Sequence, residues 1–370
     1  MKYLRLLLLL FITSGLISSC KVGRFFIYNF ADIKDHKKFP SRTALNDSVT
    51  FRFTVAENGR VPKNIGIDGI DQPFEDYLKK NKTVAFLIIQ NDTIQYENYF
   101  RGYDQSSVVP SFSMAKSITS ILIGCAIDEG LITSVNEPVT NYIPELTENG
   151  FEKVTIEMLL QMTSGLEFNE SYFNPFGDAA TFYYGTNLRK SIAKLKLDDS
   201  AENKFNYVSG DTQLLGLVLE RALKTKTLTQ YLEEKLWIPL EMEYDATWSL
   251  DRKKNGLEKT FCCINARARD FAKIGRLYLN KGNWNGKQIV SESWVEQSTK
   301  IDTGNGSAWL YQYQWWLPSR TGDFMAQGIL GQYIYVNPNN NVVIVRLGKN
   351  RGDANWWEVL TTLGQAYTLD

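Results

Sequence analysis

Residues 110–120 are PSFSMAKSITS, and they contain the segment Ser113-Met114-Ala115-Lys116. A hydroxyl and an amine at this spacing lie on one face of a helix, so the two side chains can share a hydrogen bond. The following residues predict a helix over 113–130, with a largely apolar stripe and Gly130 at its C-terminal end. Ser113 would then stand at the helix start, where free N–H groups and the helix dipole favour an alkoxide or an oxyanion.

Lys116 is the nearest group that could activate this hydroxyl. The one histidine, His36, lies far upstream between two charged residues that predict a solvated loop, so a Ser-His-Asp triad lacks a suitable base. Burial would lower the pKa of Lys116 and favour its free amine. The alternative is a helix-capping serine with a surface lysine, and spacing alone leaves both interpretations open.

The same spacing occurs at Ser18 with Lys21 and at Ser191 with Lys194. Ser18 belongs to an N-terminal leader, and the second pair precedes the charged stretch LKLDD, which offers no buried helix. The context therefore favours Ser113.

The first twenty residues, MKYLRLLLLLFITSGLISSC, predict an export signal, with two early cations and an apolar run too short to span a bilayer. Their end, ISSC, is similar to the lipobox of bacterial lipoproteins, whose cysteine is acylated after cleavage. We therefore expect residues 1–19 to be a signal peptide and Cys20 to carry a lipid. The protein would be a bacterial membrane-anchored lipoprotein facing the periplasm or the cell exterior. An ordinary signal peptide with a spare cysteine is the alternative.

Charge and cysteine content exclude several classes of function. Lys plus Arg and Asp plus Glu both total 41, so no net field attracts nucleic acid. Cys125 lies on an apolar helical face, and a disulfide between the adjacent Cys262 and Cys263 would be strained, so we expect three packing thiols. Clustered histidines and spaced cysteine pairs are absent from the sequence, which predicts no metal site and no cofactor.

Two β-hairpins predict one antiparallel sheet. The first is VAFLIIQNDTIQYENYF from Val84, and the second is GQYIYVNPNNNVVIVRLG at 331–348, followed by a helix that Asp353 could cap. The chain between the hairpins is expected to be largely helical and to form a helical insertion at about 112–240. Residues 20–70 are expected to form an N-terminal extension. Helices are expected near 113–130, 155–163, 210–224 and 227–236.

The order of these motifs resembles that of the serine β-lactamase and penicillin-binding-protein superfamily. The resemblance rests on SMAK opening a helix after a hairpin, on Tyr207-Val208-Ser209-Gly210, and on GILGQ at 328–332 before a strand. It is greatest toward esterases, class C β-lactamases and 6-aminohexanoate-dimer hydrolases. It implies a mixed α/β (α+β), β-lactamase/transpeptidase-like fold for residues 71–370, with an antiparallel sheet flanked by helices.

The resemblance also implies roles for individual residues. Ser113 matches the acylated nucleophile, Lys116 the lysine that shares its proton, and Tyr207 the tyrosine that relays protons to the leaving group. Ser209 stands where many relatives have asparagine, and its hydroxyl can still hydrogen-bond the lysine. The backbone N–H groups of Ser113 and Ile329 would form the oxyanion hole.

The strand beside the site departs from the family pattern. Relatives that act on penicillins or D-alanyl peptides usually carry Lys-Thr-Gly there, whereas this chain has Ala326-Gln327-Gly328. Without that cation a carboxylate substrate loses a charge-assisted hydrogen bond of roughly 1.5–3 kcal/mol, so neutral esters or amides are favoured. Gln327 and Gly328 remain candidates for substrate support.

The aromatic loop at 168–185 corresponds to a segment that overhangs the site in 6-aminohexanoate-dimer hydrolases. Tyr172 and Asp178 could touch substrate there, although such aromatics more often pack a core.

Together these features predict a serine hydrolase that acts through an acyl-enzyme on a small neutral ester or amide. Either Lys116 or Tyr207 could be the base. The alternatives are a β-lactamase or D,D-peptidase, and a non-hydrolytic sensor that is acylated once.

Overall fold

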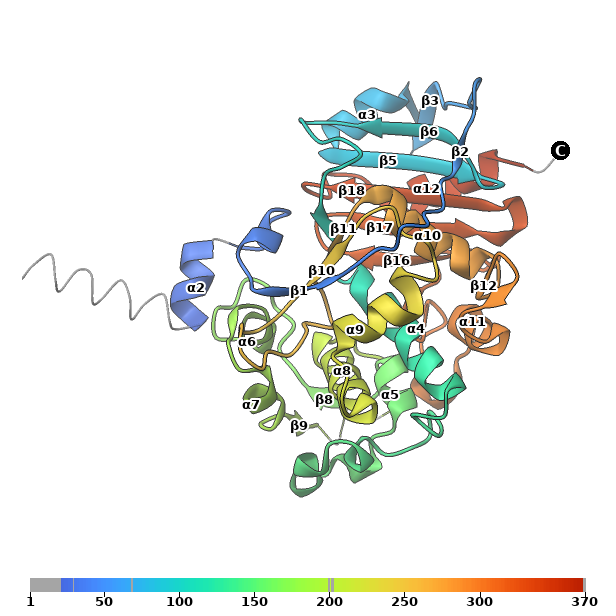
Figure 1. Ribbon diagram of the computed structural model, residues 1–370. Coiled ribbons are helices and arrows are strands. Elements are labelled where there is room, and N and C mark those ends of the chain that lie inside the picture. The colour runs from blue at the N-terminus through green and yellow to red at the C-terminus, as the bar shows by residue number, and fades with distance from the viewer. Residues whose placement is uncertain (1–20, 29, 68, 199, 201–202, 369–370) are drawn as a thin grey trace, which may run out of the picture.

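An eight-stranded sheet organises the protein (Figure 1). The computed structural model describes residues 21–28, 30–67, 69–198, 200 and 203–368. The sheet order is β14-β15-β16-β17-β18-β5-β6-β2, antiparallel throughout except for the parallel pair β2–β6. Both predicted hairpins, β5–β6 and β17–β18, are confirmed as neighbours through β18–β5. The strands are β2 (Thr54–Val55), β5 (Thr83–Gln90), β6 (Thr93–Tyr99), β14 (Tyr311–Gln312), β15 (Trp315–Trp316), β16 (Phe324–Gly328), β17 (Gln332–Asn337) and β18 (Val342–Gly348).

Helices cover both faces of this sheet. Helix α10 (Ala268–Leu279) packs on one face, and α3 (Phe74–Lys80) and α12 (Trp356–Ala366) pack on the other. Every residue of β5 is therefore buried, which explains its continuous apolar run. The predicted cap of α12 is wrong, because the residue that precedes the helix is Asn355 rather than Asp353.

The helical region lies below the sheet in Figure 1 and confirms the predicted helices. Its central helix, α4, is buried from Met114 to Ala126 and thus on all sides, rather than along one stripe as the sequence suggested. The helices are α4 (Met114–Asp128), α5 (Ile156–Gln161), α6 (Asp178–Tyr184), α7 (Leu188–Ile192), α8 (Ser209–Leu223) and α9 (Leu228–Leu232), which continues as the π-helical turn η5 (Glu233–Trp237). Outside this region lie α2 (Lys21–Tyr28) and α11 (Glu292–Thr299).

A second, four-stranded sheet leads the chain into α4. Its order is β1-β10-β11-β7, and β7 ends just before Ser113. Strands β1 and β2 come from residues 41–55, so the N-terminal part of the chain supplies a strand to each sheet. The strands are β1 (Ser41–Ala44), β7 (Val109–Pro110), β10 (Ala246–Ser249) and β11 (Ile264–Ala266); the small pairs are β3 (Asn64–Ile67) with β4 (Ile70–Pro73), β8 (Leu166–Glu167) with β9 (Lys196–Leu197), and β12 (Asn283–Trp284) with β13 (Lys287–Gln288).

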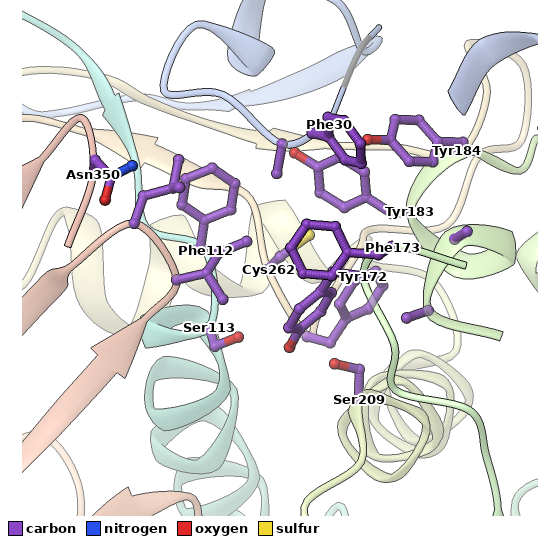
Figure 2. A pocket seen from close by; sticks show the side chains of 16 residues that line it. Phe30, Phe112, Ser113, Tyr172, Phe173, Tyr183, Tyr184, Ser209, Cys262 and Asn350 are labelled. Atoms are coloured by element: carbon purple, nitrogen blue, oxygen red, sulfur yellow. The ribbon is translucent and has the colours of Figure 1, made fainter. Parts of the chain in front are cut away.

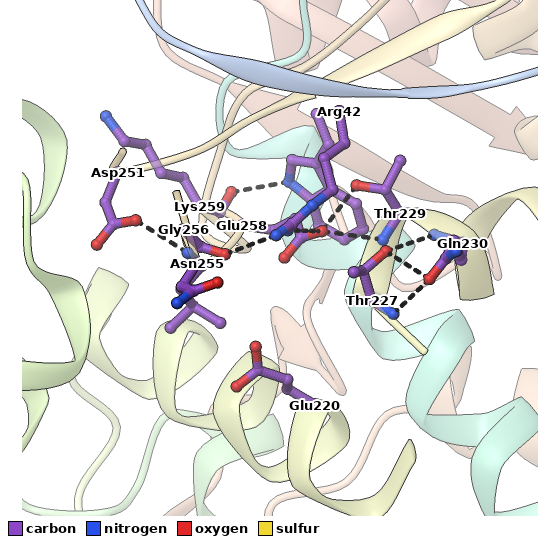
Figure 3. A network of polar contacts seen from close by, with 12 residues as sticks. Arg42, Glu220, Thr227, Thr229, Gln230, Asp251, Asn255, Gly256, Glu258 and Lys259 are labelled. Carbon is purple, nitrogen blue, oxygen red and sulfur yellow. Dashed lines mark hydrogen bonds and ion pairs between the residues drawn. The ribbon is translucent and has the colours of Figure 1, made fainter. Parts of the chain in front are cut away.

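A buried polar network fixes the segment between β10 and β11 (Figure 3). Arg42 donates to Glu258 at 2.7 Å and to the Gly256 carbonyl at 3.0 Å. The Thr229 hydroxyl donates to the same Glu258 oxygen at 2.8 Å. The segment held in this way continues to Phe261, whose carbonyl faces the candidate site.

Candidate active site

Ser113 lies at the junction of β7 and α4. Phe112 has a φ of 44°, in the left-handed region that bulky residues avoid, and the helix begins at Met114. Ser113 is therefore the N-cap residue, but its side chain makes no capping hydrogen bond. The Ser113 hydroxyl is therefore not used to cap the helix.

Lys116 is buried one turn along α4, with 1% of its surface exposed. Its Nζ donates to Ser209 Oγ at 2.9 Å and to the Phe261 carbonyl at 3.2 Å. Burial lowers its pKa to about 8, although the negative charges of Glu170 and Asp211 act in the opposite direction. About one tenth of the amine is therefore uncharged at pH 7, far more than for a surface lysine, and this fraction can accept a proton.

Tyr207 completes the group around this amine. The centroid of its ring lies 5.1 Å from Lys116 Nζ, and Trp316 and Tyr311 pack against it at 5.3 and 5.7 Å. Burial raises the pKa of Tyr207 above its usual value, a hydrogen bond with Ser113 opposes this shift, and Glu170 adds to it. The phenol therefore keeps its proton at neutral pH.

Ser209 links the lysine to a carboxylate that the sequence analysis missed. The predicted hydrogen bond between Ser209 and Lys116 is confirmed, and Ser209 Oγ in turn donates to Glu170 at 2.6 Å. Glu170 also accepts the Ser209 backbone N–H at 2.7 Å and the Tyr172 hydroxyl at 2.8 Å. One glutamate in an irregular loop carries no sequence signal, because only the tertiary fold brings it to the N-terminus of α8.

Gly328 brings strand β16 against the nucleophile loop. A Cβ at this position would lie 2.4 Å from the Ser111 carbonyl oxygen and 3.1 Å from the Ser113 nitrogen. Glycine is therefore required for the backbone contact. The next residue, Ile329, lines the pocket, and its pairing with the Ser113 N–H as an oxyanion hole stays a prediction.

A cavity of about 340 Å³ opens above Ser113 and Ser209 (Figure 2). Aromatic and aliphatic side chains dominate its wall, and no charged residue is among the described residues that line it. The lining residues are Phe30, Ala31, Phe112, Ser113, Tyr172, Phe173, Ala179, Ala180, Tyr183, Tyr184, Ser209, Phe261, Cys262, Ile329, Leu330 and Asn350.

The remaining candidates occupy different places. Tyr172 lines the cavity as expected, and its hydroxyl is bound to Glu170. Asp178 instead accepts the Asn169 backbone N–H at 2.9 Å and is not among the lining residues, so its contact with substrate stays a prediction. Gln327 accepts the Trp357 indole N–H at 2.6 Å, outside the cavity lining.

The expectation of three packing thiols is wrong for two of them. Cys262 and Cys263 form a disulfide between neighbouring residues, with Cα atoms 3.7 Å apart, whereas Cys125 is free and buried. The left-handed φ of 74° at Cys263 accompanies this tight connection, which sequence spacing argued against. Cys262 contributes to the cavity wall.

Other candidate chemistry lies elsewhere. His36 is half-buried rather than solvated, its Nδ1 bonds the Ile33 carbonyl at 3.2 Å, and burial lowers its pKa. Lys194 is exposed, which confirms the rejection of the Ser191 pair. The described residues contain no group of three His, Cys, Asp or Glu side chains able to hold a metal ion. Over the same residues no helix is long and apolar enough to span a membrane, and the predicted leader and Cys20 lie outside them.

Comparison with known proteins decides the family. The sequence pattern of the β-lactamase family matches residues 70–355. The chain belongs to the β-lactamase family. The predicted resemblance and fold class are thereby confirmed, and the matched residues include the whole Ser113, Lys116 and Tyr207 group.

Individual members of the β-lactamase family show which hydrolases this chain is similar to. It is 28% identical over 295 residues to the 6-aminohexanoate-dimer hydrolase of Paenarthrobacter ureafaciens, covering 74% of each chain. A solved structure from Bacillus anthracis, described as a candidate 6-aminohexanoate-dimer hydrolase, superposes with a TM-score of 0.78 at 26% identity, covering 90% of this chain and 91% of that one. A family VIII carboxylesterase shares the fold, with a TM-score of 0.63 at 18% identity over 80% and 95% of the two chains. Family and relatives point to a hydrolase.

Proposed function

We propose that the protein is a serine hydrolase in which Ser113 attacks an ester or amide carbonyl and forms an acyl-enzyme. The observation that carries this proposal is the buried Lys116 amine, with its pKa lowered to about 8, lying beside Ser209 and the Tyr207 ring. An amine poised near neutral pH can accept a proton that a surface lysine, with a pKa of about 10.4, would not take.

In this mechanism the Ser113 proton passes to Lys116, directly or through Tyr207. The Ser113 oxygen bonds to the carbonyl carbon, and the resulting oxyanion is held by the N–H groups of Ser113 and Ile329, at about 3 kcal/mol per donor. Tyr207 gives a proton to the departing alcohol or amine, which breaks the ester or amide bond. Water then attacks the acyl-enzyme by the same proton path and releases the acid.

The substrate is a small neutral molecule. The described lining of the cavity holds no charged side chain, and Ala326 is fully buried where relatives that bind carboxylates place a lysine. A carboxylate would lose its hydration there without gaining a cation. Carboxylesterase or amidase activity is therefore favoured over the hydrolysis of penicillins.

Labelling with a fluorophosphonate tests the nucleophile. The wild type and the decoy variant Ser191→Ala should be labelled, and Ser113→Ala should not. Labelling that survives Ser113→Ala places the nucleophile elsewhere. Nitrocefin turnover equal to that of p-nitrophenyl acetate would instead favour a β-lactamase, and one equivalent of product followed by arrest would favour an acylated sensor.

We also propose that a lipid on Cys20 anchors the protein at the periplasmic or outer face of a bacterial membrane. The ISSC segment after an apolar leader supports this proposal. Incorporation of labelled palmitate into the wild type, and its loss in Cys20→Ala, is the expected result. Equal incorporation of palmitate in both proteins would show that the lipid is not attached to Cys20.

A further inference from the structure

Exposed hydrophobic side chains lie on two segments that reach the cavity. Among the described residues, every phenylalanine with a largely exposed side chain belongs either to residues 26–30 or to residues 173–176, and Phe30 and Phe173 line the cavity. We call this set the aromatic rim; its members are Phe26, Ile27, Phe30, Phe173 and Phe176, which are 66%, 55%, 45%, 78% and 73% exposed. Soluble proteins rarely leave such residues together in water, so the rim indicates a contact with an apolar partner.

The rim and the cavity share two side chains (Figure 2). Phe30 and Phe173 belong to both, and their rings lie 5.6 Å apart. The buried ring of Phe25 supports the rim from below, at 5.6 Å from Phe26 and 5.5 Å from Phe30. A molecule that leaves an apolar phase at the rim would therefore enter the cavity without crossing a polar barrier.

The position of the rim in the chain indicates what that phase is. Helix α2 begins at Lys21, the residue bonded to Cys20, and it packs on α6 beside the cavity (Figure 1). Residues 21–31 contain no acidic residue, so their charge does not oppose a surface of anionic lipids. A lipid on Cys20, one residue before this helix, would hold the rim at the membrane surface.

We propose that the aromatic rim inserts into the outer layer of a lipid bilayer and that the cavity receives ester or amide substrates with an apolar acyl chain directly from it. The second part rests on the proposed hydrolase function, whereas the first does not. The geometry places the cavity mouth at the membrane surface, so that the substrate partitions into lipid before it meets Ser113.

Flotation with vesicles tests the membrane contact without help from a lipid on Cys20. The chain from Lys21 onward carries the whole described fold and is mixed with phosphatidylcholine–phosphatidylglycerol vesicles. Phe26→Ser with Ile27→Ser should lower the vesicle partition coefficient at least about tenfold, because two exposed side chains no longer leave water. The matched control is Leu131→Ser with Ile238→Ser, each 39% exposed elsewhere on the surface, and it should bind as the wild type does.

Hydrolysis measured on the same proteins tests the delivery of substrate. Turnover of soluble p-nitrophenyl acetate should not change in the rim variant, whereas turnover of p-nitrophenyl decanoate dissolved in vesicles should fall with binding. A wild type that does not float, or a rim variant that floats equally well, overturns the membrane contact. An unchanged decanoate rate despite lost binding overturns delivery.

Two further outcomes keep the proposals apart. A dimer that dissociates in the rim variant would assign the rim to a second copy of the chain and overturn the membrane contact. Flotation of a protein that hydrolyses neither ester would remove the hydrolase proposal and leave the membrane contact standing.

Discussion

Replacement of Glu170 by glutamine should move the acidic limb of the pH profile downward. The Glu170 charge raises the pKa of both Lys116 and Tyr207. Without it the lysine becomes a free amine at lower pH, so the acidic limb of kcat/KM shifts down. Tyr207 also loses its proton at lower pH, but burial raises the pKa of its phenol so far above the usual value that this change lies outside the measured range.

The size of the shift follows from the geometry. Lys116 Nζ and Glu170 Oε1 lie 2.9 and 2.6 Å from the same Ser209 oxygen. Two unit charges on the order of 5 Å apart interact by roughly 3 kcal/mol at an effective dielectric constant of ~20. Glu170 is partly exposed, and solvent screening reduces this to about 1.4 kcal/mol, or about one pH unit.

The assay is the pH dependence of kcat/KM for p-nitrophenyl acetate between about pH 5 and 10. Glu167→Gln removes an exposed carboxylate three residues earlier in the chain and serves as the control, because its profile should stay in place. A glutamine at 170 also offers one acceptor oxygen to three donors, so the plateau should fall by about tenfold. An acidic limb that stays fixed, or that rises, would refute the electrostatic coupling.

Three further substitutions test the structure around this group. Lys116→Met should abolish activity. Because the pKa of Lys116 is about 8 in the folded and 10.5 in the unfolded protein, the unfolding free energy of the wild type should rise by about 3 kcal/mol relative to this variant between pH 7 and 10.5. An equal difference between wild type and variant in urea unfolding at the two pH values would contradict this. Gly328→Ala should lower the thermal midpoint and kcat through its clash with the nucleophile loop, at a cost of about 1–3 kcal/mol, whereas Gly66→Ala, which has open space, should be neutral. Arg42→Met should lower the free energy of unfolding in urea by about 3–5 kcal/mol, because it leaves the buried Glu258 without a counter-charge. Arg221→Met, which breaks an exposed ion pair, should lower it by less than about 1 kcal/mol. Equal losses in the two variants would mean that burial of the ion pair does not decide its contribution.

The sheet could be predicted from sequence because its signals are local. The Asn91-Asp92 turn and the alternating or continuous apolar runs around it define β5 and β6 without reference to the rest of the chain. The four-stranded sheet could not be predicted, because its strands β1, β10, β11 and β7 are short and come from distant segments. Their pairing depends on tertiary contacts, such as that between Arg42 and Glu258, which leave no periodic pattern.

The site divides in the same way. Ser113 and Lys116 are three residues apart at the start of α4, as their spacing predicted, and the hydrogen-bond partners of Lys116 Nζ are Ser209 and the Phe261 carbonyl. Glu170 reaches Ser209 only because an irregular loop folds over the start of α8. The bond between Cys262 and Cys263 went unpredicted because adjacent cysteines were expected to strain a disulfide, and the left-handed φ of Cys263 that accompanies it leaves no sequence pattern.

A lowered pKa does not by itself identify the functional lysine. Burial lowers the pKa of Lys259 to about 7, further than that of Lys116, yet its ammonium group bonds the Tyr183 carbonyl and lies 3.5 Å from the Phe39 ring. No described hydroxyl is hydrogen-bonded to it. Two carboxylates partly offset the cost of burial for each lysine, Glu170 and Asp211 for Lys116 and Asp251 and Asp35 for Lys259. Lys116 differs because it bonds the Ser209 hydroxyl and lies one helical turn from Ser113. The proposed role of Lys116 therefore rests on its hydrogen bond with Ser209 and its place one turn from Ser113, and not on its lowered pKa alone.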